Sequence, residues 1–269
     1  MMARHDAGVR FRAPTLVLPV LPVLALVLAL TGALSSCSDD PEPATGPGLP
    51  SQEALQSYFE AIASGDADQT EQARKEVAAK GSPAAGYAAY VGATDEANAN
   101  AGGAADPVDV EAVDRGFRAC VADDQCIAWT NLKGQDGRLV DFTVGGVLLT
   151  DSLVDLTAQA PIAAPGLYRV QPEWAYRVPN GILNVVVTVT ALDVPLSPKP
   201  ATYIAGDQII KGVKDVYPDT VDAGSTSPVV LSFEDTNDVT LDGQITFALK
   251  LGDDGSESIG FGLADPPGS

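Results

Sequence analysis

Histidine is nearly absent from this sequence, and its absence limits the chemistry that the chain can perform. The single histidine, His5, precedes a long apolar segment, in a stretch that we expect to be removed. The rest of the chain therefore cannot form a Ser-His-Asp or Cys-His catalytic arrangement, a histidine metal site or a histidine pH switch. An enzyme would have to use carboxylates, lysine, tyrosine or a Ser-Lys pair, and the S-x-x-K motif does not occur.

Basic residues are scarce as well, with 16 Lys and Arg against 36 Asp and Glu. Residues 1–36 hold three of the basic residues and one of the acidic residues, so the chain from Cys37 onward has a formal charge of −22. This excess opposes binding to nucleic acid and to anionic lipid headgroups, both of which require clustered Lys and Arg. We interpret the acidic surface as a solubility feature and expect no nucleic-acid partner.

An uncharged apolar run from Leu16 to Cys37 follows three arginines, which is the arrangement of an export signal. The four residues that end this run, 34–37, read Leu-Ser-Ser-Cys and resemble the lipobox of bacterial, in particular actinobacterial, secreted lipoproteins. The resemblance implies that residues 1–36 are a signal peptide and that Cys37 is acylated, with palmitate as an expected chain. It also implies anchoring to the cell membrane on its extracytoplasmic face.

An uncleaved membrane-spanning helix is the alternative interpretation of the same run, since about 20 apolar residues can cross a bilayer. Pro19 and Pro22 lie inside the run and disfavour a regular spanning helix. Both interpretations place residues 38–269 outside the cytoplasm on a membrane tether.

Cysteine parity predicts one disulfide in the exported chain. With Cys37 used by the anchor, Cys120 and Cys126 remain as an even pair. A redox role is the alternative, but thioredoxin-like pairs have the spacing C-x-x-C and a lowered thiol pKa. The acidic Asp123 and Asp124 between the two cysteines would raise a thiol pKa instead. We therefore predict a structural disulfide that holds a turn between two segments.

The tether and the first module follow the cysteine. Residues 37–50 are rich in Pro, Gly and acidic residues, which predicts a flexible extended spacer. Residues 51–150 are predicted to form an α+β module that begins with three helices, the first with an apolar stripe at helical spacing. The expected N-terminal caps are Ser51, then Asp66 or Asp68, and finally Ser82 with Pro83 behind it.

A β-hairpin is predicted after a flexible connector over residues 98–107. The β-prone runs 126–132 and 138–144 are separated by a segment in which Asp136-Gly137 supplies a tight turn. Alternation along the first run predicts that Ile127 and Trp129 face the same layer.

Helices followed by a hairpin, with the stretch SYFEAIASGDA in the first helix, weakly resemble the NTF2-like domains of exported actinobacterial proteins. The resemblance implies a pocket between helices and sheet, which Tyr58 and Trp129 could line, although such aromatics are usually core residues. The Asp-His pair of the family's enzymes has no counterpart, because histidine is lacking.

The second half of the chain reads as an all-β sandwich, behind a Pro- and Gly-rich linker at residues 151–166. Seven short runs of β-prone residues lie in the sandwich, residues 167–264, and residues 265–269 form a tail. Within 183–190, the odd-numbered Leu and Val side chains are expected on one buried face, and Val186 with two threonines on a half-buried face. The seven runs are 167–170, 174–178, 182–190, 201–204, 229–233, 244–251 and 258–262.

The sandwich also resembles the immunoglobulin-like, telokin-like domains of secreted bacterial lipoproteins. The matching elements are the strand NVVVTVTALDVPLSP, the segment KPATYIAGD, the Gly turn VDAGSTSP with Ala223-Gly224-Ser225, and the strand VVLSF that ends in Phe233. The Cys…Trp…Cys core of antibody domains is missing, so only the architecture carries over. That architecture hosts many functions.

Acidic clusters at 123–124, 234–238 and 253–257 raise the question of calcium binding, but none has the D-x-D-x-D-G spacing, and such residues also favour turns. We therefore predict no metal, cofactor or catalytic residue. The expected function is that of a non-enzymatic lipoprotein that binds or organises a partner protein of the cell envelope. The alternatives are a carrier of a small apolar ligand in the first module and a carboxylate-based envelope hydrolase.

Overall fold

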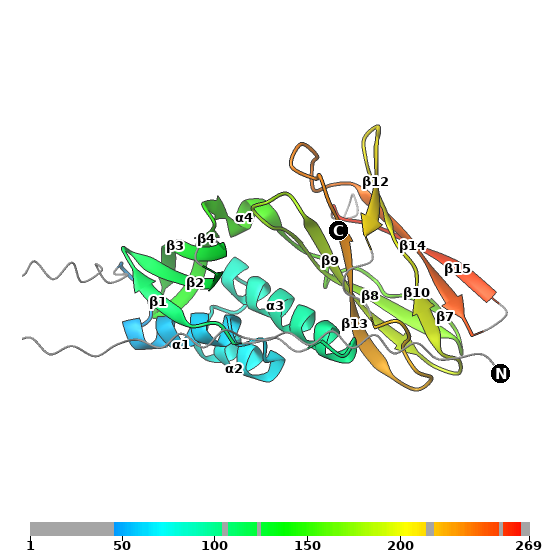
Figure 1. The fold of residues 1–269 in the computed structure, drawn as a ribbon, viewed down its shortest axis with the longest axis horizontal. Coiled ribbons are helices and arrows are strands. Elements are labelled where there is room, and N and C mark those ends of the chain that lie inside the picture. Colours follow the sequence, from blue (N-terminus) through cyan, green and yellow to red (C-terminus); the bar gives the residue numbers. More distant parts are fainter. Residues whose placement is uncertain (1–45, 104–106, 123–124, 214–217, 253–254, 265–269) are drawn as a thin grey trace, which may run out of the picture. The chain divides into compact units, whose positions relative to one another are not determined.

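The computed structural model describes residues 46–103, 107–122, 125–213, 218–252 and 255–264. Three layers are visible in Figure 1: helices, a five-stranded sheet that covers one side of them, and a larger β structure on the other side. The described residues belong to one compact unit that contains two hydrophobic cores. The chain is thus an α+β protein with a β-sandwich or half-barrel.

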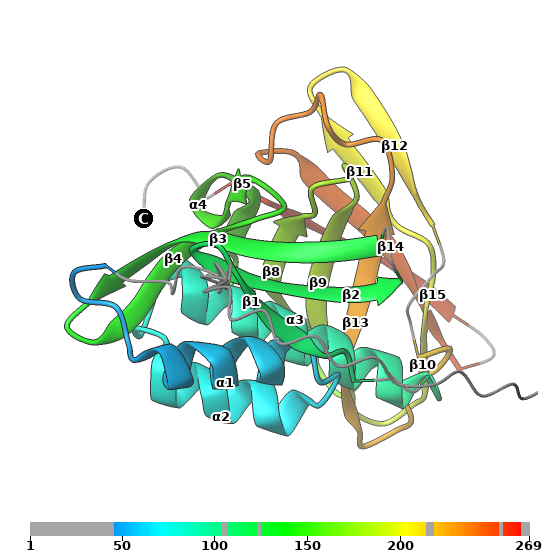
Figure 2. The ribbon, with the colours of Figure 1, turned by 60° about the vertical axis from the view of Figure 1, so that its left-hand side comes forward.

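Three helices form the middle layer, and each begins at a side chain that caps it. The Oγ atoms of Ser51 and Ser82 accept hydrogen bonds from the backbone N–H groups three residues on, and Asp66 accepts from two N–H groups. These contacts confirm the predicted caps, with Asp66 rather than Asp68 at the second helix. Figure 2 shows the three helices side by side. They are α1 (Gln52–Ile62), α2 (Ala67–Val77) and α3 (Pro83–Asn100).

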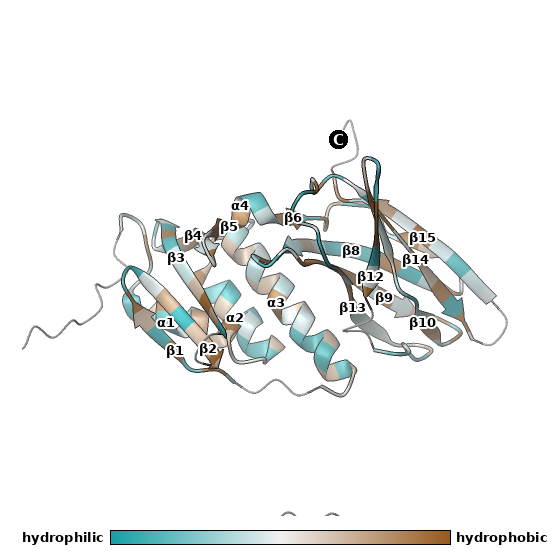
Figure 3. Cartoon of the chain, turned by 45° about the horizontal axis from the view of Figure 1, so that its top comes forward, coloured by the Kyte–Doolittle hydropathy of each residue, from teal (hydrophilic) through white to brown (hydrophobic). Residues whose placement is uncertain are grey.

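Helix α3 extends into the segment that the sequence predicted to be a connector. The helix continues to Asn100, whose Nδ2 atom donates a hydrogen bond of 2.9 Å to Oγ of Ser227. Its last turns are hydrophilic in Figure 3. The connector prediction was wrong for residues 98–100, because this tertiary contact and the helical tendency of alanine extend the helix. Residues 104–106 lie outside the described part of the chain.

The smaller sheet is antiparallel and packs on the helices in the order β1-β2-β3-β4-β5. The predicted hairpin is present, with Asp136 and Gly137 at positive φ in its turn. Trp129 is buried, whereas Ile127, two residues earlier on the same strand, is 50% exposed. Ile127 lies on the same face of β3 as Trp129, as alternation predicted, but it is too exposed to belong to the core. The strands are β1 (Val110–Val113), β2 (Gly116–Ala122), β3 (Gln125–Gln135), β4 (Arg138–Val144) and β5 (Val147–Leu148).

The larger sheet follows the short helix α4 (Leu149–Ser152) and folds back on itself as a sandwich. Strand β12 pairs with both β11 and β13 and so joins the two halves. The two runs predicted at 167–170 and 174–178 are one strand, β8, interrupted by a β-bulge. The strands are β6 (Leu153–Asp155), β7 (Ile162–Ala164), β8 (Tyr168–Arg177), β9 (Leu183–Ala191), β10 (Leu196–Pro198), β11 (Thr202–Ala205), β12 (Gln208–Val213), β13 (Thr226–Phe233), β14 (Gln244–Leu251) and β15 (Gly255–Gly262).

The stretch 151–166 is more than the linker that its Pro and Gly residues predicted. It includes strands β6 and β7, both of which pair with β8 and extend the sandwich. Edge strands of only three residues leave little periodicity in a sequence, because only one or two of their side chains reach the core. The sandwich therefore begins before the predicted boundary at residue 167.

Strand β9 contributes side chains to both hydrophobic cores. Its odd-numbered side chains point into the sandwich core, as alternation predicted. Val186, on the other face, is fully buried in the first core with Tyr176 and Val230 of the neighbouring strands. Helix α3 covers this face and contacts β8, β9 and β13. The middle of the larger sheet thus supports both cores. The even-numbered face of β9 is half buried as predicted, except at Val186, which is fully buried.

Candidate functional site

The predicted lipidation residue, Cys37, lies outside the described residues. The structure therefore describes the folded part of the chain but not its expected anchor. In the part that is described, no helix is both long and apolar enough to cross a membrane.

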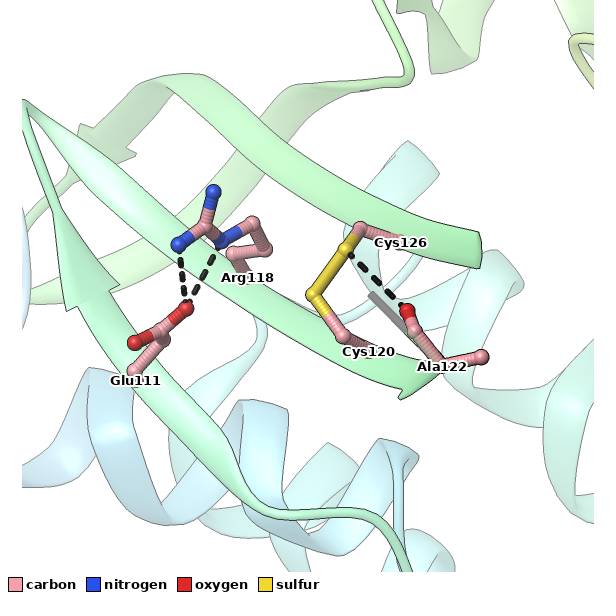
Figure 4. The surroundings of a disulfide bond; sticks show 5 residues. All are labelled: Glu111, Arg118, Cys120, Ala122 and Cys126. Carbon is pink, nitrogen blue, oxygen red and sulfur yellow. Dashed lines mark hydrogen bonds and ion pairs between the residues drawn. A yellow bond between two sulfur atoms is a disulfide. The ribbon is translucent and has the colours of Figure 1, made fainter. Parts of the chain in front are cut away.

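The predicted disulfide joins the ends of a hairpin. The sulfur atoms of Cys120 on β2 and Cys126 on β3 are 2.01 Å apart, at bonding distance. Figure 4 shows them near the end of β2 and the start of β3, on the same sheet as the ion pair between Arg118 and Glu111. The side chains around the pair are exposed, with Val121 at 70%. This position suits a covalent clamp between β2 and β3, whose pairing register shifts just beyond Cys120.

The acidic clusters provide no metal site within the described residues. No group of three His, Cys, Asp or Glu side chains in these segments is arranged to hold a metal ion. Asp235 has a positive φ, which is typical of turns. The carboxylate of Glu257 accepts a hydrogen bond of 2.5 Å from the Tyr168 hydroxyl instead. Residues 123–124 and 253–254 lie outside the description.

The space between α1 and the smaller sheet is filled by aromatic rings. The Phe59 ring lies 4.9–5.3 Å from the rings of four neighbours, measured between centroids. Those neighbours are Tyr58, Phe117, Trp129 and Phe142. All five side chains are buried, and the Tyr58 hydroxyl donates to the backbone oxygen of Ala84. Tyr58 and Trp129, the residues expected to line a pocket or to be core, are core residues.

An open cleft of about 560 Å³ lies where the N-terminal half of α3 meets the edge of the larger sheet. One wall comes from the end of α2 and the start of α3, and the other from α4, β6 and β8. Its volume falls within the range of about 300–1,000 Å³ that is typical of small-molecule sites. The side chains that give the cleft its chemistry are Arg74, Lys80, Ser82, Thr150, Asp155, Thr157, Glu173 and Trp174.

The β-bulge in β8 brings two side chains into this cleft. The register shifts between Pro172 and Trp174, and both Glu173 and Trp174 line the cleft. In a regular strand, neighbouring side chains would point to opposite faces. The bulge changes this alternation, as bulges near functional sites commonly do. Asp155 pairs with Trp174 across the strands and lies beside it.

Gly86 of α3 allows the helix to approach the ring of Trp174. A Cβ atom at position 86 would lie 2.7 Å from Cζ3 of Trp174 and 3.0 Å from Cδ2 of Leu153. Any larger residue would therefore displace the indole ring. The glycine allows Trp174 to stay half-buried, with part of its surface open to the cleft.

The two walls of the cleft carry opposite charges. Arg74 and Lys80 are on the helical wall, and Asp155 and Glu173 are on the sheet wall. Arg74 is bound to Glu71 through Nε and one terminal nitrogen, whereas Lys80 is exposed and makes no ion pair with a described residue. Glu173 accepts from the Thr188 hydroxyl through Oε1, and Asp155 accepts from Thr157 through Oδ1.

Asp95, in the C-terminal half of α3, is a partly buried carboxylate outside the cleft. One of its oxygens is buried and has no hydrogen-bond partner among the described residues. Burial and, to a lesser extent, the negative charge of Asp66 raise the pKa of the Asp95 carboxyl to about 6. The buried hydroxyl of Tyr90, one turn before it, is bound to Asn184 of β9 at 2.9 Å. Asp95 itself is influenced by Asp66, the residue that caps the start of α2.

We expect Asp95→Asn to stabilise the protein at pH 7 by about 1 kcal/mol, after allowance for solvent screening. The folded state raises the pKa of this carboxyl and so binds a proton more tightly than the unfolded state does. Stability is therefore lost as the pH rises from about 4 to about 6, and the amide removes this loss. Thermal unfolding at pH 4 and pH 7 measures the effect. Glu96→Gln, at the exposed neighbouring position, serves as the control, and equal shifts at both pH values in D95N would contradict the prediction.

Sequence reasoning did not identify the cleft or Asp95. The signal for the cleft was weak: a Pro-Glu-Trp sequence divides β8, and proline within a strand marks an edge or a bulge. The spacing of residues in the sequence does not show that Gly86, almost ninety positions earlier, packs against Trp174 of this bulge.

Comparison with protein-family models, with curated proteins and with solved structures found no match to this chain. The described fold places the protein in the α+β structural class, with a β-sandwich whose central strands also pack against a helical layer.

Proposed function

We propose that this protein is a non-enzymatic lipoprotein, anchored through an acylated Cys37 to the extracytoplasmic face of the cell membrane, where its folded part binds an envelope partner. The observation that carries the proposal is the export signal that ends in Leu-Ser-Ser-Cys. The disulfide distance between Cys120 and Cys126 supports it, because such bonds persist in oxidising compartments outside the cytoplasm.

Binding rather than catalysis is supported by the side chains of the described part. The sandwich and the helical layer share strands β8, β9 and β13, so the described residues form one compact unit that a partner can bind. The cleft beside α3 provides charged and aromatic groups on two walls. The aromatic rings between α1 and the smaller sheet occupy the volume that an apolar ligand would need, so we do not favour the carrier alternative.

The finer fold relationships belong to the same proposal. We propose an immunoglobulin-like, telokin-like ancestry for the sandwich. It is supported by the turn at Gly224, which is followed in the chain by strand β13, and by the buried Phe233 at the end of that strand. An NTF2-like origin is proposed for the helices and the smaller sheet, on the order of helices before strands alone. Neither relationship is needed for the proposed anchoring.

Substituting Cys37 with serine is expected to move the protein from the membrane fraction to the soluble fraction, because the variant lacks the thiol that would be acylated. Stable anchoring needs two or more acyl chains, and none would remain at this position. Membrane fractionation and metabolic labelling with an alkyne analogue of palmitate measure anchor and acylation together. The double variant Cys120→Ser/Cys126→Ser retains Cys37 and should remain labelled and membrane-bound. Full membrane retention of C37S without label would instead favour a spanning helix.

A further inference from the structure

We infer that the cleft between α3 and the edge of the larger sheet binds a short zwitterionic peptide, one with a free carboxylate and a free ammonium group. The inference deepens the proposed binding role and rests on that role for its biological setting. It does not depend on lipidation of Cys37, which lies outside the cleft-lining residues.

The helical wall provides the site for the carboxylate end of such a peptide. Lys80 has an exposed ammonium group with no ion-pair partner among the described residues, and Arg74 lies beside it in the same wall. Two hydrogen bonds to Glu71 hold the Arg74 side chain by one edge of its guanidinium group. Arg74 is only partly buried, so a ligand can reach its guanidinium group. Because this group is charged, its hydrogen bonds to a carboxylate would be charge-assisted.

The sheet wall provides the site for the ammonium end. Asp155 and Glu173 each use one carboxylate oxygen for a bond to a threonine hydroxyl. No donor among the described residues reaches their second oxygens, Oδ2 of Asp155 and Oε2 of Glu173. Because ionised carboxylates accept several hydrogen bonds, both can receive a ligand ammonium.

Trp174 lies on the sheet wall beside Asp155, where its ring meets Gly86 of α3, and it supplies an apolar surface for the middle of the ligand. The hydroxyl groups of Ser82, Thr150 and Thr157 line the same space and can bind peptide N–H and C=O groups. A cleft volume of about 560 Å³ accommodates two or three small residues. The cleft therefore holds cationic, apolar and anionic groups, which complement the carboxylate, the backbone and the ammonium group of one short peptide.

Other ligand classes fit this charge distribution less well. A phosphate-rich ligand would meet the carboxylates of Asp155 and Glu173 on the sheet wall, with like charges opposed. A neutral ligand would leave charged groups of both walls without partners as the cleft loses water, which costs free energy. The zwitterion is the class in which both walls gain a partner.

Calorimetric titration of the full-length chain in detergent with the zwitterion L-trialanine tests the inference. We expect saturable binding that is lost with N-acetyl-trialanine amide, which has the same backbone and neither charge. Lys80→Met and Glu173→Gln are each expected to weaken binding at least tenfold. Glu173→Gln keeps an oxygen that can accept from Thr188, so its effect should not come from unfolding. Lys211→Met, on strand β12 and outside the cleft, should leave the affinity unchanged.

Three results would overturn the inference. They are no binding of trialanine, equal binding of the capped and free peptides, and unchanged affinity in K80M with an unchanged melting temperature. Equal binding of both peptides would indicate a neutral ligand at this cleft. These outcomes concern only the cleft, whereas membrane retention of C37S concerns only the anchor, so the two proposals fail separately.

Discussion

Replacing Phe59 with alanine is expected to lower the free energy of unfolding by about 3–5 kcal/mol. The Phe59 side chain is fully buried, and four aromatic rings surround it at 4.9–5.3 Å. Its removal deletes apolar burial, aromatic contacts and packing on the face of Trp129, and leaves a cavity that rigid rings cannot close.

Urea unfolding followed by tryptophan fluorescence measures this loss, because Trp129 stacks on the Phe59 ring with centroids 5.0 Å apart. Ile127→Ala is the matched control, since it truncates a side chain of the same sheet that is 50% exposed. We expect less than about 1 kcal/mol from the control. Similar losses in both variants would mean that the aromatic cluster does not provide the packing described here.

Replacing Val186 with aspartate is expected to destabilise the protein by about 3–5 kcal/mol, because it places an unpaired charge in a buried site. Val186 is fully inaccessible and lies in the first core, on the face of β9 that α3 covers. The substitution therefore acts on the junction between the helical layer and the sandwich. It should separate the two cores without removing a side chain from the sandwich core itself.

Amide hydrogen exchange on the variant, at a temperature where it remains folded, locates the damage. We expect protection to fall in α3 and in β8, β9 and β13, the strands that α3 contacts. Leu192→Asp introduces the same charge at a position that is 42% exposed and should cost less than about 1 kcal/mol. Loss of protection confined to β14 and β15 in V186D would contradict the shared role of β9.

Local elements could be read from the sequence because their causes are local. Ser51, Asp66 and Ser82 cap their helices with contacts to residues two or three positions away. The Asp136-Gly137 turn needs positive φ angles, which these two residues tolerate, and so the hairpin was predictable. Alternation in β9 likewise gave the odd-numbered side chains from Leu183 to Val189 that lie in the sandwich core.

The failures of prediction arise where a distant element decides. The strands β1 and β2 were not predicted, since their side chains include Glu111 and Arg118, which pair with each other only across the ladder. Alternation along β3 places Ile127 on the face that points to the core. It lies near the end of the β2–β3 hairpin, however, and is exposed there. Periodicity defines the face of a strand and cannot define how far the covering layer extends.

The sequence by itself predicted the pairing of Cys120 with Cys126 and the α+β class with a β-sandwich, and the expected export signal and lipidation at Cys37 rest on the sequence alone. Each depends on residues close together in the chain or on their number. Only the tertiary structure decided that α3 covers β9 at Val186, and that Gly86 makes room for Trp174 beside a cleft with opposite charges. Those contacts join segments about a hundred residues apart, and close packing between layers, which no local pattern encodes, selects them.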